Sequence, residues 1–241
     1  MRLTQLFCLP YAGGGASVFN HWKSLLPPQV EMIPIELPGR GTRYTEPFYE
    51  SFQEAVADIK RIMWAKYSGG NYAVFGHSMG CWLAYELYKD ISRKGEALPT
   101  CMFLSGRAAP CEQNIRTRLH LQSDARIIAE LKRLGGTSKE IFEDKDMLSI
   151  VIRVMRADLK LLENYKFNDD GTQIESSVMI LGGTRDNTMS KRQIERWRRH
   201  ASSPIHVHWV DGGGHFFIHT HAQEVTRAIC DLILINQVMH V

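Results

Sequence analysis

Three residues that could act together in nucleophilic catalysis follow one another along the chain in the order Ser78, Asp186, His215. Ser78 lies between two glycines in Gly76-His77-Ser78-Met79-Gly80, and glycines also precede the other two residues. A serine hydroxyl becomes a nucleophile when a histidine takes its proton and a carboxylate orients that histidine. The sequence therefore has to be searched for elements that would bring the three side chains together.

The residues around Ser78 predict a strand, a tight turn and a helix. Residues 71–75 are aromatic or β-branched in part, and apolar residues recur at mostly helical spacing over 81–91. This is the pattern of a nucleophile elbow, whose flanking glycines leave room that a Cβ would fill. A glycine-flanked serine that merely caps a helix is the competing interpretation, but the strand and helix on either side favour catalysis.

His215 is the best candidate for the base. It follows an expected strand over 205–210 through Asp211-Gly212-Gly213-Gly214, a turn that can present a side chain at the carboxyl end of that strand. His206 and His208 fall within the strand pattern and are expected on a sheet face.

A metal site is the alternative for the histidines in this region. His215, His219 and His221 lie close together, but no Asp or Glu stands at ligand spacing in the run, and the aromatic and aliphatic residues between them indicate packing. We therefore expect no bound metal.

Asp186 is the best candidate for the acid because it directly follows an expected strand over 178–181. That position puts it at the same sheet edge as Ser78 and His215. Asp211 competes by its nearness to His215 in sequence, but it is better explained as a turn residue bonded to the glycine backbone. Asp169 and Asp170 precede the strand and would lie at its other end.

Acyl transfer to a serine also needs hydrogen-bond donors for the oxyanion that develops. The backbone N–H of Met79, at the start of the helix after Ser78, is one candidate. The second is the N–H of Ala12, in the glycine-rich loop Pro10-Tyr11-Ala12-Gly13-Gly14-Gly15. A phosphate-binding loop is the competing interpretation of these glycines, but no Gly-Lys-Ser/Thr or complete Gly-x-Gly-x-x-Gly follows. No cofactor is expected.

Length and composition are those of an ordinary globular protein of one domain, or of one domain with an insertion. The 241 residues are 44% hydrophobic and 23% charged, and the formal net charge is only +3. No basic run interleaved with aromatic residues indicates nucleic acid, and no stretch approaches the length of a membrane span. The five scattered cysteines indicate reduced thiols, and residues 3–9 read as a first strand and not as a signal peptide, so a cytoplasmic location is expected.

Strand and helix patterns alternate along most of the chain, which predicts an α/β fold with a mostly parallel sheet flanked by helices. The expected strands are 4–9, 31–36, 71–75, 100–104, 178–181 and 205–210, and the expected helices of this alternating part are 18–26, 52–66, 81–91, 191–200 and 222–235. Residues 107–166 break the rhythm with helical patterns only, at 124–134 and 147–165. The domain is thus expected as a core of 1–106 and 167–241 with an all-helical insertion, 107–166, that forms a lid and not a mere packing elaboration.

Several motifs together resemble those of type II thioesterases, stand-alone α/β-hydrolases that accompany polyketide synthases and nonribosomal peptide synthetases. The matching segments are Pro10-Tyr11-Ala12-Gly13-Gly14, Leu37-Pro38-Gly39-Arg40-Gly41, Gly76-His77-Ser78-Met79-Gly80 and Gly213-Gly214-His215-Phe216-Phe217, with Leu134-Gly135-Gly136 and Arg156-Ala157-Asp158 in the insertion. Two positions differ from the usual pattern: Cys81 follows the elbow where a smaller residue is common, and Asn187-Thr188-Met189 follows the acid.

The resemblance implies hydrolysis of acyl thioesters held on the phosphopantetheine arm of acyl- or peptidyl-carrier domains, in an editing role that clears stalled or misprimed acyl groups. It also implies a triad of Ser78, Asp186 and His215, with the Ala12 and Met79 amides as the oxyanion hole. An oxygen-ester hydrolase of the same fold is the alternative, and a non-catalytic carrier-binding module is disfavoured by the filled triad positions. Monomer is the default expectation.

Two sets of residues could bind the substrate or its carrier. Basic residues that could dock an acidic carrier are Lys191, Arg192, Arg196, Arg198 and Arg199 on one helix and Arg116, Arg118 and Arg126 near the lid. A solvated helix face is the preferred interpretation of the first group, whereas for Arg116 and Arg118 both interpretations stay open. Lid residues Ile128, Leu131, Met147, Ile150 and Met155 could line an acyl channel, although packing alone gives amphipathic helices the same pattern.

Overall fold

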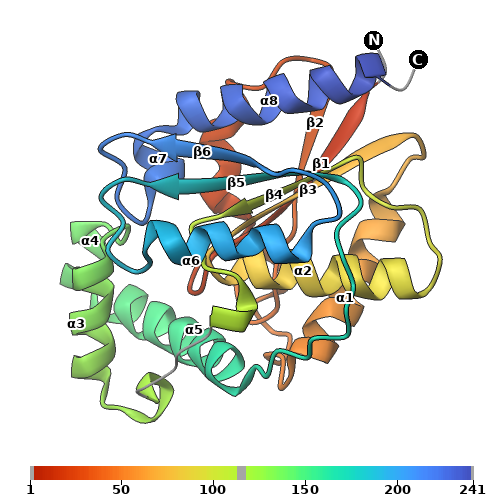
Figure 1. Cartoon of the computed structure of the whole chain (residues 1–241). Helices are drawn as coiled ribbons and strands as arrows, with labels where there is room; N and C mark the ends of the chain where they lie inside the picture. The colour runs from red at the N-terminus through yellow and green to blue at the C-terminus, as the bar shows by residue number, and fades with distance from the viewer. Residues whose placement is uncertain (1–2, 113–117, 240–241) are drawn as a thin grey trace.

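The computed structural model describes residues 3–112 and 118–239, and its centre is a six-stranded sheet (Figure 1). The strands are β1 (Thr4–Leu9), β2 (Val30–Pro34), β3 (Asn71–His77), β4 (Cys101–Ser105), β5 (Ser177–Gly183) and β6 (His206–Val210). They lie in the order β2-β1-β3-β4-β5-β6, and every neighbouring pair is parallel. The predicted α/β fold with a parallel sheet is confirmed.

Helices cover both faces of the sheet, so the central strands are buried on both sides. The helices are α1 (Phe52–Lys66), α2 (Met79–Arg93), α3 (Asp124–Leu134), α4 (Lys139–Glu143), α5 (Lys145–Asn164), α6 (Lys191–Glu195), α7 (Phe217–Thr220) and α8 (Ala222–Met239). Helices α1, α2 and α6 pack on one face, and α8 packs on the other with a 3-10 helix at Ala16–Trp22 (Figure 1). All six residues of β1 and all five of β4 are buried. Strands that are covered on both faces of a parallel sheet are typically near-continuous apolar runs, as these two are.

The helices begin where side chains can satisfy their free amides. Ser51 accepts a hydrogen bond from the Glu54 amide at the start of α1 (3.1 Å), and the Asp144 carboxylate accepts from two amides at the start of α5. None of the helices of the described residues is long and apolar enough to cross a membrane.

Two segments expected as α-helices have 3-10 geometry instead. The helix expected over 18–26 is a 3-10 helix at Ala16–Trp22, and the one expected over 191–200 is α6 followed by a 3-10 helix at Arg196–His200. A 3-10 helix has three residues per turn, so residues three apart share a side. Ile194, Trp197 and His200 have that spacing, and all three are buried against the core.

The described residues of the 107–166 region, 107–112 and 118–166, pack at the end of the sheet to which the strand arrows point. In the described part of this region the structure contains two short 3-10 turns, α3, α4 and α5, and no strand. Figure 1 shows α3 and α4 beside the arrowheads of β5 and β6. The described helices of the region expected as a lid therefore lie near the carboxyl ends of the strands, where Ser78, Asp186 and His215 are located.

Candidate active site

Ser78 lies on a strained corner between β3 and α2. Its φ is +52°, and it is the only residue other than glycine with a positive φ in the described part of the chain. A Cβ at Gly76 would lie 2.0 Å from the Gly80 carbonyl oxygen, and a Cβ at Gly80 would lie 2.3 Å from the Leu9 carbonyl oxygen. Both glycines are thus sterically required, because backbone cannot move aside as a flexible side chain can.

The structure brings the three predicted side chains into a hydrogen-bonded line. The Ser78 hydroxyl lies 3.1 Å from His215 Nε2, and His215 Nδ1 lies 2.8 Å from Asp186 Oδ2. The loops after β3, β5 and β6 supply one residue each. Parallel strands end at the same sheet edge, which is why residues 108 and 29 positions apart along the chain (78 to 186, 186 to 215) meet.

The surroundings of Asp186 favour its ionised carboxylate, which is the state that stabilises a neighbouring imidazolium. Burial opposes its ionisation, but hydrogen bonds from His215 and from the Thr188 hydroxyl (2.7 Å) and amide (2.9 Å) outweigh burial and lower its pKa. Thr188 belongs to the segment that differs from the thioesterase pattern, so this departure adds a partner to the acid. Asp211 is exposed and accepts a hydrogen bond from Thr184 at 3.1 Å.

His77, next to the nucleophile, holds the backbone of His215 in place. Its Nε2 donates to the His215 carbonyl oxygen (2.9 Å), so its Nδ1 accepts from the Ser105 hydroxyl (2.8 Å) when the ring is neutral. Full burial lowers the pKa of His77 well below its usual value, which keeps the ring neutral at physiological pH. Sequence reasoning treated His77 only as part of the elbow motif.

The buried His77 ring makes stability depend on pH. Its folded-state pKa lies below the unfolded value of about 6.5, so the unfolded chain takes up the proton first and stability falls as pH drops below that value. Denaturant unfolding of the wild type and His77→Gln between pH 7 and pH 5 should differ in slope by up to about 1.4 kcal/mol per pH unit. His206→Gln, at an exposed ring, should keep the wild-type slope; equal slopes for all three proteins would contradict the prediction.

Of the two predicted oxyanion-hole amides, that of Ala12 belongs to a residue that lines the Ser78 cavity, and that of Met79 directly follows the nucleophile. The amides of Ala12 and Met79 have no hydrogen-bond acceptor among the described residues, so both remain available to a ligand. Ala12 lines the cavity that contains Ser78 and His215. Met79 is the first residue of α2, where amides are free and the helix dipole favours negative charge.

A buried ion pair connects the Ala12 loop to lid helix α5. The Arg40 guanidinium donates two hydrogen bonds of 2.6 Å to the two carboxylate oxygens of Asp158, and Arg40 also donates to the Gly14 carbonyl (2.8 Å). Asp158 in turn accepts from the Gly13 amide at 2.7 Å. The loop, the residues after β2 and the lid are therefore fixed to one another next to Ala12.

The cavity at Ser78 has a volume of about 180 Å³ and is mostly apolar on its lid side. Of the residues expected to line an acyl channel, Leu131 and Met155 line this cavity, whereas Met147 and Ile150 are 54% and 42% exposed and Ile128 packs against Ile127, Leu131, Ile152 and Met155. Three larger hollows among the described residues, of about 390, 670 and 250 Å³, contain none of the three catalytic candidates. The sequence analysis missed Arg107, which also lines the Ser78 cavity.

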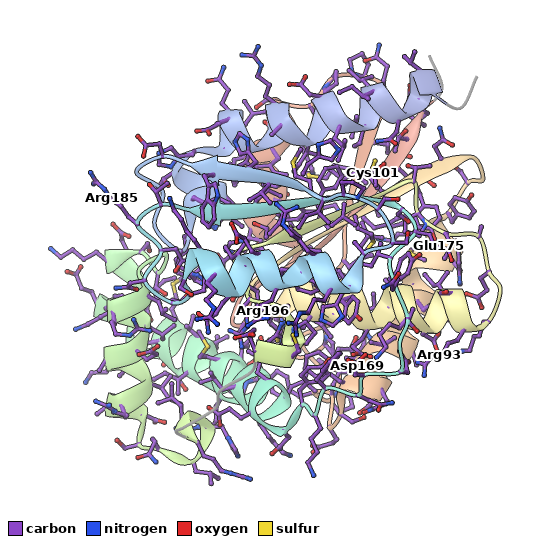
Figure 2. The ribbon with its side chains drawn as sticks, viewed as in Figure 1. Arg93, Cys101, Asp169, Glu175, Arg185 and Arg196 are labelled. Carbon is purple, nitrogen blue, oxygen red and sulfur yellow. The ribbon has the colours of Figure 1, made fainter. Side chains whose placement is uncertain are left out.

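Other candidates for chemistry near the site are inert or lie at the surface. Cys81 is fully buried, and burial raises the pKa of its thiol, so it packs as a small apolar residue. Figure 2 shows Arg185, the neighbour of Asp186, extending away from the ribbon. No three His, Cys, Asp or Glu side chains of the described residues converge in a metal-binding group.

The basic residues proposed for carrier docking lie mainly at the surface. Lys191, Arg192, Arg198 and Arg199 are exposed, while Arg196 pairs with Glu112 (3.1 Å). Arg118 and Arg126 are exposed near the lid, and Arg116 lies outside the described residues. These positions fit a solvated face and a docking rim equally well.

The parallel sheet, the strained serine corner and the line of three side chains define an α/β-hydrolase. A family model described as the thioesterase domain matches residues 4–233, so the chain belongs to the thioesterase family and is an enzyme of that class.

One named relative and two solved structures are similar to this chain over most of its length. The chain is 33% identical to the gramicidin S biosynthesis protein GrsT of Aneurinibacillus migulanus, over 94% of this chain and 87% of that protein. The crystal structure of ClbQ from the colibactin NRPS/PKS pathway superposes with a TM-score of 0.93 at 29% identity, covering 98% of this chain and 99% of the other. The type II thioesterase BorB from the borrelidin biosynthetic cluster gives 0.86 at 29% identity over 95% and 92%.

Proposed function

We propose that this chain is a type II thioesterase that removes acyl groups from the phosphopantetheine arms of carrier domains in polyketide or nonribosomal peptide biosynthesis. Membership of the thioesterase family and likeness to structures of type II thioesterases over nearly the whole chain support the substrate class. The observation that carries the catalytic assignment is the hydrogen-bonded line from Ser78 through His215 to Asp186 at the cavity.

In the acylation step, His215 Nε2 takes the hydroxyl proton while Ser78 Oγ attacks the thioester carbonyl carbon. The carbonyl oxygen becomes an oxyanion that accepts hydrogen bonds from the Met79 and Ala12 amides. Asp186 orients the imidazole and stabilises the imidazolium. The tetrahedral intermediate collapses by breaking the carbon–sulfur bond, His215 protonates the departing pantetheine thiolate, and the acyl group remains on Ser78.

Deacylation repeats the chemistry with water. His215 removes a proton from water as its oxygen attacks the acyl-serine ester, and then returns that proton to Ser78 Oγ as the free acid leaves. A thiol ionises near pH 8.5 and is a good leaving group, so we expect hydrolysis of the acyl-serine ester to limit turnover. We further propose that the enzyme acts as a monomer in the cytoplasm, where its cysteines, all free in the structure, remain thiols.

The test is thiol release from acyl-loaded carrier domains and from acyl-pantetheine, measured for the wild type and Ser78→Ala. We expect release that depends on Ser78, is faster from carriers, and exceeds the rate on oxygen esters with the same acyl group. Ser24→Ala, at an exposed serine, is the control and should match the wild type. Wild-type release from Ser78→Ala, or cleavage of oxygen esters alone, would overturn the proposal.

A further inference from the structure

Arg107 places a positive charge in the wall of the same cavity as Ser78 and His215. It follows β4 directly after Gly106, and its guanidinium carbon lies 4.1 Å from the centre of the Trp82 ring. Trp82 is itself fixed, because it is buried in α2 and its indole N–H donates to the Ala108 carbonyl at 2.9 Å. The arginine head group therefore lies over a fixed aromatic ring.

No carboxylate of the described residues lies at ion-pair distance from Arg107, although the more distant Asp186 carboxylate raises the pKa of its guanidinium. The Arg107 side chain forms no hydrogen bond or ion pair with the residues that the structure describes, whereas Arg133 in the same cavity donates to both oxygens of Glu130, at 2.6 and 2.8 Å. The Asp186 carboxylate is occupied by His215 and Thr188. Burial lowers the pKa of Arg107 to about 10, a value at which the guanidinium stays protonated at neutral pH.

A partly buried guanidinium without an anion is costly unless a ligand supplies one. The planar guanidinium matches a carboxylate by two parallel hydrogen bonds. On the lid side the cavity is lined by Glu130 and Arg133, which pair with each other, and by apolar side chains that suit a short methylene chain, those of Leu131, Met155, Leu159 and Leu162. Among its described lining residues the cavity thus offers a nucleophile, apolar side chains and a guanidinium, that of Arg107, without an ion-pair partner.

We propose that this enzyme prefers acyl groups that carry a carboxylate beyond the thioester carbonyl, and that Arg107 is the residue that selects them. The inference rests on the proposed function, because it concerns which acyl group enters the cavity beside Ser78. A neutral acyl chain of the same length would cover the guanidinium and leave it unpaired. Sites with buried polar groups reject ligands that lack the matching partner far more strongly than they reject a change of one methylene.

The test compares glutaryl-pantetheine with pentanoyl-pantetheine, which have equal chain lengths and differ in a terminal carboxylate against a methyl group. For the wild type we expect kcat/KM to be about 10- to 100-fold higher for the glutaryl thioester, the range of a hydrogen bond to a charged group. Arg107→Gln should lose that preference by slowing the glutaryl reaction and sparing the pentanoyl one. Arg107→Lys should retain part of it, and Arg227→Gln, at an exposed arginine of α8, should retain all of it.

Inhibition of the wild type by amides that resemble the two acyl groups provides a measurement that needs no variant. The monoamide of glutarate should inhibit pentanoyl-pantetheine hydrolysis at a concentration about tenfold or more below that of pentanamide, which lacks a carboxylate. Equal inhibition by the two amides, no glutaryl preference in the wild type, or an equal loss on both thioesters in Arg107→Gln would overturn the assignment. Hydrolysis of pentanoyl-pantetheine that still depends on Ser78 would, in those cases, leave the proposed thioesterase function intact.

Discussion

Replacing Asp186 by asparagine is expected to lower kcat about 10⁴-fold, the scale of effect seen when a serine-triad aspartate is replaced in this way. The carboxylate accepts a hydrogen bond from His215 Nδ1 at 2.8 Å, and an amide can present its N–H₂ there instead. The imidazole would then carry its proton on Nε2, where it cannot accept the proton of Ser78. The fold should persist, because the amide keeps the shape of the side chain. Single-turnover acylation and steady-state hydrolysis of one acyl-pantetheine would measure the effect.

Asp211→Asn is the matched control for this experiment. Asp211 also follows a strand and lies near His215 in sequence, but its carboxylate is exposed and accepts from Thr184. We expect its kcat to stay within about threefold of the wild type, since surface substitutions of this kind perturb little. A large loss in Asp211→Asn together with an active Asp186→Asn would transfer the role of the acid to Asp211.

Replacing Asp158 by alanine is expected to lower the free energy of unfolding by about 3–5 kcal/mol, because it strands a buried guanidinium. The side chains of Arg40 and Asp158 are only 8% and 5% exposed. The substitution also removes the acceptor of the Gly13 amide and so releases the loop that presents the Ala12 amide. We therefore expect kcat to fall with little change in KM, since an oxyanion donor acts mainly in the transition state.

Two further variants distinguish the effect of the Arg40–Asp158 ion pair on the free energy of unfolding from its effect on the position of the Ala12 loop. Glu143→Ala removes an exposed partner of Lys139, with side chains 66% and 86% exposed, and should cost less than about 1 kcal/mol. The double variant Arg40→Met with Asp158→Leu replaces the ion pair by apolar side chains, so unfolding stability should largely return. Its kcat should stay low, because the Gly13 amide still lacks an acceptor. Recovery of kcat along with stability would show that the pair has no positioning role.

The sequence by itself determined the strands, helices and turns that depend on residues close together along the chain. The nucleophile corner could be predicted because its glycines and its flanking strand and helix lie within about twenty residues of Ser78. The strand order along the chain then located Asp186 and His215, because parallel strands must end at one edge. The parallel α/β fold follows from the same alternation of strand and helix patterns, and the structure confirms it.

Tertiary structure alone decided the contacts between residues that are remote in sequence. Arg40 pairs with Asp158 across 118 positions, and His77 bonds the His215 carbonyl across 138. Such neighbours also decide which arginine has an ion-pair partner. Arg133 pairs with Glu130, whereas Arg107 packs on the face of Trp82 and pairs with no carboxylate of the described residues. The hydrophobic periodicity of a sequence indicates which face of a helix or strand is buried, but not which residues cover that face. That information arises only when helices and loops from distant parts of the chain pack together, and here it decides how the lid, the Ala12 loop and the acyl cavity fit around Ser78.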